Sequence, residues 1–297
     1  MSYEIDRQIK KYCVKVPFKA GLISLSHAPM ELMLKLVRTP GVNIHKADAN
    51  GCPVYIFEPD GLKSYAPCLV FFHGGGFGFK AAPHHKKLAA LLAEEVGCRV
   101  IFPDYRLLPE YPYPAAREDA LKAYRYACES YPESRLAVAG DSAGGALAVY
   151  VVHDAAAAGL RTPLLQMLLY PVIDAEAAVE SKKSFPDTPL WNSKNDEEMW
   201  SMFLGLNKLH EASPMQMELP DDVPDAYIET AEFDCLHDED IAYAKKLEKA
   251  GASVELRQTS GTPHGYDIAV NSDVVKDCLA GRVAALKRVF DMKVINS

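Results

Sequence analysis

A serine stands among closely spaced glycines in the run GDSAGG at positions 140–145, which fits the pattern G-x-S-x-G. This pattern is typical of a sharp turn between a strand and a helix that presents a nucleophilic serine hydroxyl. Such a turn needs glycine because backbone segments approach each other closely there. A purely structural turn is the alternative reading. The candidate nucleophile is Ser142.

A triple glycine follows an apolar run in the segment HGGGF, residues 73–77. Glycine leaves backbone N–H groups uncovered, so that they can point at a negatively charged oxygen. A phosphate-binding loop would need a Gly-Lys-Ser/Thr sequence, which is missing here. We therefore expect an oxyanion hole formed by the N–H groups of Gly74, Gly75 and Ala143, the last of these at a helix N-terminus. His73 is expected to orient this loop rather than to act as a base.

A serine nucleophile needs a general base and an acid that orients it. His264 lies in the segment PHGY, residues 263–266, between the last expected strand and the last expected helix. In α/β-hydrolases the acid lies between serine and histidine in the sequence, and Asp234 has this position. Asp238 is a rival that an N-cap role in the next helix would explain. Glu232 is a third candidate.

Strand-like and helix-like runs alternate along most of the chain, which predicts an α/β domain with a mostly parallel sheet and helices on both faces. The expected strands are Val42–Asp48, Cys52–Glu58, Cys68–Phe72, Arg99–Phe102, Leu136–Ala139, Leu164–Leu169, Ala226–Ala231 and Ser253–Arg257. The expected helices are Pro83–Val96, Ala115–Ser130, Ala143–Ala158, Asp238–Ala250 and Asp273–Phe290.

Two segments do not follow this alternation. We expect a catalytic domain made of residues 42–177 and 216–297, with an N-terminal cap segment at 1–41 and a helical cap insertion at 178–215. Both extra segments carry apolar side chains, which must pack against another part of the protein to be shielded from water. In the insertion these are Trp191, Met199, Trp200, Met202, Phe203 and Leu204. The edge formed by the carboxyl ends of the strands is the usual place, although packing on the flank of the core is the alternative.

Five motifs occur in the order found in the hormone-sensitive-lipase-like esterases of the α/β-hydrolase fold, which the chain resembles. They are HGGGF (73–77), DYRLLPEYPYPAA (104–116), GDSAGG (140–145), DCLHDE (234–239) and PHGY (263–266). The resemblance implies hydrolysis of carboxylic esters with Ser142 as nucleophile, Asp234 as acid and His264 as base. It also implies a cap built from the N-terminal segment and the insertion.

This sequence departs from the family pattern at four positions, none of them catalytic. The family usually has alanine at Leu108, proline at Cys235 and phenylalanine at Tyr266, and frequently glycine at Lys80. The departures affect the expected shape of the pocket more than the reaction. Short-chain acyl esters are the expected substrates. An amidase or peptidase with the same triad, and a catalytically silent ligand-binding protein, are the alternative functions.

Composition excludes several other classes of protein. The formal net charge of −8 lacks the basic footprint of a nucleic-acid-binding protein. No run of 18 apolar residues predicts a membrane span, and the N-terminus does not read as a secretory signal. Seven scattered cysteines indicate free thiols in a reducing cytoplasm. We expect no metal or organic cofactor. His84 and His85 are interpreted as residues of a solvated helix start rather than as metal ligands. A homodimer is possible on the sequence alone.

Overall fold

The computed structural model describes residues 3–205 and 212–291. Its strands form one sheet in the order β1-β2-β4-β3-β5-β6-β7-β8. The strands are β1 (Val42–Ala49), β2 (Cys52–Pro59), β3 (Cys68–Phe72), β4 (Arg99–Pro103), β5 (Leu136–Asp141), β6 (Leu165–Leu169), β7 (Asp225–Phe233) and β8 (Val254–Pro263). The helices are α1 (Arg7–Lys10), α2 (Ala20–Leu36), α3 (Pro83–Val96), α4 (Ala115–Ser130), α5 (Ala143–Ala157), α6 (Glu180–Ser184), α7 (Ser193–Leu204), α9 (His237–Lys249) and α10 (Asp273–Asp291), with a 3₁₀ turn η1 (Tyr266–Ala269). Parts of the expected cap and catalytic segments, at 1–2, 206–211 and 292–297, lie outside the described residues.

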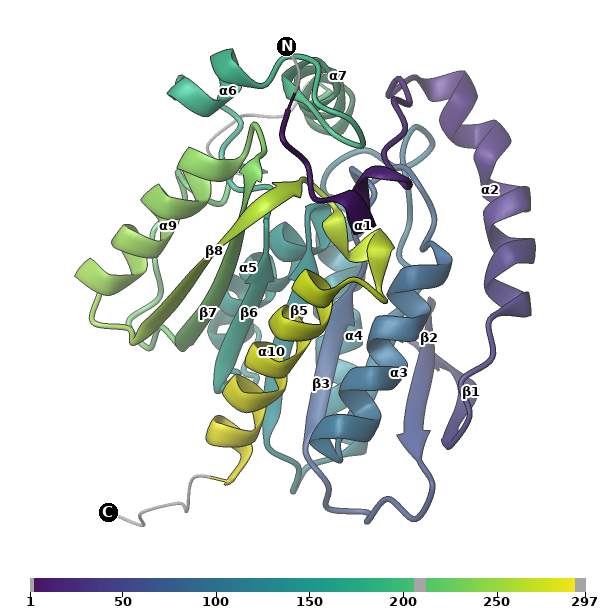
Figure 1. Ribbon diagram of the computed structural model, residues 1–297. Coiled ribbons are helices and arrows are strands. Elements are labelled where there is room, and N and C mark those ends of the chain that lie inside the picture. Colours follow the sequence, from purple (N-terminus) through teal and green to yellow (C-terminus); the bar gives the residue numbers. More distant parts are fainter. Residues whose placement is uncertain (1–2, 206–211, 292–297) are drawn as a thin grey trace.

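The sheet is parallel except at one edge, where β2 pairs antiparallel with both β1 and β4. The central strands β3, β4, β5 and β6 are buried along their whole length, as expected for parallel strands covered on both faces. Helices α4, α5 and α9 pack on one face, and α3 and α10 on the other (Figure 1). The predicted α/β architecture is confirmed.

The predicted end of the last strand was wrong. We expected it at Arg257, but β8 continues to Pro263. The added residues pair in register with β7, where Thr259 lies opposite Ala231 and Pro263 opposite Phe233 across a bulge. The polar run from Gln258 to Gly261 resembles a loop in sequence, and pairing with a long neighbouring strand holds it in the sheet. This extension delivers the PHGY loop to the carboxyl edge.

A cap-like layer of helices lies beyond the carboxyl ends of the parallel strands. Helices α6 and α7 occupy this end of the molecule, and α2 runs along the side of the antiparallel edge (Figure 1). The outward side of α2 carries Leu25, Leu32 and Leu36, each more than half exposed. Within the described ranges, no helix combines the length and apolarity needed to cross a bilayer.

One buried cation joins three elements beneath the PHGY loop. The side chain of Arg282 on α10 is fully buried, with Nη2 at 2.6 Å from Glu229 Oε2 on β7 and Nη1 at 2.9 Å from Asp267 Oδ1 on η1. The hydroxyl of Tyr170 donates to the Asp267 carboxylate at 2.6 Å, and that of Tyr266 donates to Glu229. Because Arg282 supplies the positive charge, the two carboxylates can be buried together.

We expect Arg282→Met to lower the free energy of unfolding by about 3–5 kcal/mol, because it leaves two buried carboxylates without their cation. Arg288→Met on the same helix removes only an exposed ion pair with Glu255 and should cost about 1 kcal/mol or less. Urea unfolding followed by circular dichroism measures both. Equal losses in the two variants would contradict the role given to the buried cation.

Candidate active site

The turn between β5 and α5 holds Ser142 in a left-handed backbone conformation, with φ 54° and ψ −122°. Neighbouring backbone leaves no room for side chains around it. A Cβ atom added to Gly140 would lie 2.1 Å from the Gly144 carbonyl oxygen, and one added to Gly144 would lie 2.0 Å from the Phe72 carbonyl oxygen. The glycines of the motif are therefore required by close approach, and the predicted strand-to-helix turn is present.

Three predicted residues from distant parts of the chain meet at this turn. The Nε2 atom of His264 lies 2.8 Å from the Ser142 hydroxyl oxygen, and its Nδ1 lies 2.7 Å from Asp234 Oδ2. The other carboxylate oxygen of Asp234 accepts the N–H of Leu236 at 3.0 Å. Since Asp234 accepts the Nδ1 proton, Nε2 is left free to accept the proton of the serine. All three side chains are buried.

Neither alternative acid lies beside His264. The Glu232 carboxylate accepts the N–H of Gly261 at 2.7 Å, and the Asp238 carboxylate accepts the N–H of Ser181 at 2.9 Å. The expectation that Asp238 caps α9 was wrong, because the helix already begins at His237. Asp238 instead binds the first turn of α6, a contact between distant segments that a local pattern does not reveal.

Gly74 does not present its N–H to the catalytic serine. That group donates to Asp141 Oδ1 at 3.0 Å, so the prediction that it stabilises an oxyanion was wrong. Within the described ranges, no protein acceptor takes the N–H groups of Gly75, Gly76 or Ala143. Gly75 and Gly76 line the same cavity as Ser142. The glycine loop therefore offers its second and third amides, and its first serves as an anchor.

His85 extends this hydrogen-bonded anchor, a role that the sequence pattern did not predict. The N–H of Ala82 donates to His85 Nδ1 at 2.8 Å, so the ring carries its proton on Nε2, which lies 3.1 Å from Asp141 Oδ2. His85 is buried, and its interpretation as a solvated helix start was wrong. A hydrogen-bonded chain thus connects the start of α3, the residue before the nucleophile and the loop of Gly74.

Charge in this anchor resides on the carboxylate. Burial tends to raise the pKa of Asp141, but the adjacent His85 and its hydrogen bond outweigh burial, and the pKa falls to about 2. For His73, burial and then the neighbouring His85 lower the pKa to about 3. His73 is therefore neutral at physiological pH, stacked on Tyr105 with ring centroids 4.5 Å apart. This supports the predicted orienting role of His73.

A cavity of about 380 Å³ opens above Ser142 and His264. Its floor is formed by these residues and by the glycine loop. Its walls come from both extra segments of the chain, with Met30 on α2 and Trp191 before α7 among them. The ring of Trp191 lies 6.0 Å from that of His264 and packs edge-on against Phe18. The cavity is therefore mostly apolar around a polar floor.

The two wall segments are hydrogen-bonded to each other. Asn195 on α7 accepts the N–H of Phe18 at 3.1 Å through Oδ1 and donates to the Val16 carbonyl at 2.9 Å. The N–H of Leu190 donates to the Val14 carbonyl at 2.8 Å. No local sequence pattern predicts the role of Asn195, because its partners lie about 180 residues away in the chain.

Comparison with known proteins agrees with this geometry. The family model described as alpha/beta hydrolase fold matches residues 69–268. The chain is 33% identical to the carboxylic ester hydrolase LipN of Mycobacterium tuberculosis over 82% of this chain and 70% of the relative. It is 33% identical to the ethyl acetate hydrolase of Pseudomonas putida over 74% of this chain and 72% of the relative.

The chain belongs to the hormone-sensitive-lipase-like esterases of the α/β-hydrolase fold. Solved structures of esterases superpose closely on it. The esterase LipW of Mycobacterium marinum gives a TM-score of 0.88 at 28% identity, covering 97% of this chain and 96% of that one. A bacterial heroin esterase gives 0.84 at 28% identity, covering 97% and 98%.

We expect His85→Leu to lower kcat for p-nitrophenyl acetate about tenfold to a hundredfold, because a displaced glycine loop misplaces the donors that stabilise the transition state. KM should change little, since these donors act mainly on the transition state. His153→Leu is the matched control, because His153 lies three turns along α5 and does not line the cavity. Equal losses in both variants would refute the anchoring role.

Proposed function

We propose that this protein is a serine esterase that hydrolyses short-chain acyl esters through an acyl-enzyme. The observation that carries the proposal is the continuous hydrogen-bonded line from Asp234 through His264 to Ser142, with both links shorter than 3 Å. Its position at the floor of an apolar cavity gives a carbonyl carbon a place beside the hydroxyl. Relatives named as carboxylic ester hydrolases support the same reaction class.

The proposed reaction proceeds in two halves. His264 takes the proton of Ser142 as the serine oxygen attacks the ester carbonyl, and then delivers that proton to the departing alcohol. Water enters, loses a proton to His264 and attacks the acyl-enzyme, which releases the carboxylic acid and restores the serine. Asp234 keeps the imidazole in the productive tautomer and stabilises its positive charge.

We assign the oxyanion hole to the N–H groups of Gly75, Gly76 and Ala143. The amide of Ala143 opens helix α5, so the helix N-terminus adds its positive potential. Gly76 replaces Gly74 in the predicted set. A Cβ atom at Gly76 would lie 2.7 Å from both Phe18 and Trp191, so glycine is required there by the packing of the cavity walls.

Segments 1–41 and 178–215 are proposed to act together as the cap that limits the acyl chain. Support comes from their shared hydrogen bonds through Asn195 and from their side chains in the cavity wall. A chain longer than the cavity would have to displace Met30 or Trp191. We therefore expect selectivity for short acyl groups from these walls.

The alternatives differ in what they require. An amidase would use the same triad, and only a comparison of matched esters and amides separates it. A silent binding protein is disfavoured because the triad is complete and aligned. All seven cysteines are free, which supports the proposed location in a reducing cytoplasm. Homodimer formation stays a prediction, to be tested by sedimentation.

We expect a fluorophosphonate to label Ser142 stoichiometrically, because its activated hydroxyl attacks phosphorus as it attacks a carbonyl. Ser142→Ala and His264→Ala should each lower kcat by about 10⁴-fold or more, and the double variant should lose hardly more than either. Peptide mapping locates the label, and steady-state kinetics give the losses. Labelling at another residue, or losses that multiply, would exclude the assigned pair.

Activity on p-nitrophenyl esters should peak between acetyl and hexanoyl, since each methylene that fits adds about 0.8 kcal/mol at most. Met30→Trp should move the peak to a shorter chain because Met30 lines the cavity. Met33→Trp, on the exposed side of the same helix, should leave the profile unchanged. A profile that still rises at dodecanoyl, or equal shifts in both variants, would contradict the cap.

A further inference from the structure

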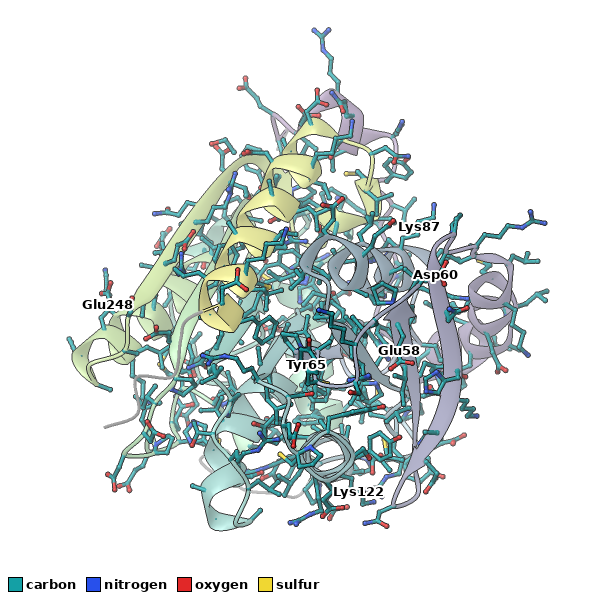
Figure 2. All side chains as sticks on the ribbon, turned by 90° about the horizontal axis from the view of Figure 1, so that it is seen from below. Glu58, Asp60, Tyr65, Lys87, Lys122 and Glu248 are labelled. Atoms are coloured by element: carbon teal, nitrogen blue, oxygen red, sulfur yellow. The ribbon has the colours of Figure 1, made fainter. Side chains whose placement is uncertain are left out.

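A second cavity of about 370 Å³ lies outside the catalytic centre, between α2, the edge strands β1 and β2, and the start of α3. Seen from below, α2 lies outside these strands at the edge of the molecule (Figure 2). The lining includes the apolar side chains of Leu34, Ile44, Phe57 and Phe102. No step of the proposed reaction uses this space.

The lining carries more positive than negative charge, in a chain whose net charge is −8. Four lysines line the cavity with only two carboxylates, Glu31 and Asp104. Glu31 pairs with Lys35 at 3.1 Å, and Asp104 lies 3.7 Å from Lys80. The ammonium groups of Lys46 and Lys86 are therefore not paired with either of these carboxylates.

The two remaining lysines face no carboxylate within 4 Å in the part of the chain that the structure describes. Lys86 donates to the Leu34 carbonyl at 3.1 Å, and burial lowers the pKa of its ammonium. Lys46 is exposed and lies over the ring of Tyr55, 5.7 Å from its centroid. The partly buried ammonium of Lys86, which has no carboxylate beside it, favours an anion from outside.

We propose that this second cavity binds an aliphatic monocarboxylate, with its chain on the apolar floor and its carboxylate between Lys46 and Lys86. The two cavities have nearly equal volumes, so each has room for an acyl chain of similar size. Such acids are the products of ester hydrolysis. Naming the enzyme's own product as the source of the acid rests on the proposed function, whereas the binding site itself does not.

The position of α2 connects the two cavities. Met30 lines the catalytic cavity and Leu34, one turn later on the same helix, lines the second one. Lys80 lines both. An acid bound beneath α2 would tie the helix to the sheet and restrain a wall that must yield for product release. The acid product is therefore expected to lower kcat from outside the catalytic site.

Calorimetric titration with hexanoate tests the site without relying on turnover, using Ser142→Ala protein. Ile44→Trp fills the second cavity and should remove the binding component assigned to it, so that only hexanoate in the catalytic cavity remains. Met30→Trp fills the catalytic cavity and should leave the second-cavity component intact. Lys86→Met and Lys46→Met should each weaken binding about tenfold or more, by loss of a charged partner. Lys87→Met, at an exposed neighbour outside the lining (Figure 2), should not, and Lys86→Arg should retain binding.

Hexan-1-ol and hexylamine of the same length should not bind, since the lysines select a negative charge. In wild-type enzyme, hexanoate should lower kcat, and Ile44→Trp should remove this effect. Binding that Met30→Trp abolishes and Ile44→Trp spares, equal binding of hexanol, or absence of binding would overturn the proposal. If the protein proved not to be an esterase, this proposal would still stand or fall on its own. Calorimetry on the Ile44→Trp and Met30→Trp variants measures binding of the acid without any turnover.

Discussion

The left-handed turn at Ser142 is the constraint on which the rest of the site depends. A non-glycine residue with positive φ is held there against its own preference, by backbone that passes within contact of Gly140 and Gly144. The turn places the serine at the end of a fully buried strand and at the start of a buried helix. Nucleophile, helix N-terminus and the Ala143 amide are therefore positioned by one local conformation.

The turn also explains why the residue before the nucleophile is a buried acid. Asp141 takes hydrogen bonds from Gly74 and His85. Its low pKa keeps it ionised, so it remains an acceptor over the physiological pH range. The strained turn and the glycine loop are thus fixed relative to each other by one carboxylate, and the Gly75 and Gly76 amides have a defined position before substrate arrives.

How much the sequence predicts depends on whether the determining contacts are local. The triad followed from motif order, and the buried strands followed from apolar runs, because each signal is contained in a few neighbouring residues. The use of the Gly74 amide, the burial of His85 and the extension of β8 to Pro263 depend on partners far away in sequence. The role of Asp238 was missed for the same reason, since its partner Ser181 belongs to the insertion.

The walls of the cavity are held by fewer constraints than its floor. The floor is constrained by backbone approach and by a buried hydrogen-bond network that includes the fully buried Arg282 beneath the PHGY loop. The walls are held by side-chain contacts such as those of Asn195 and Phe18, between segments that lie outside the sheet. A change in α2 or α7 can therefore reshape the acyl pocket without disturbing the turn at Ser142. Because α2 borders both cavities, this helix is placed to connect substrate selection with the proposed acid site.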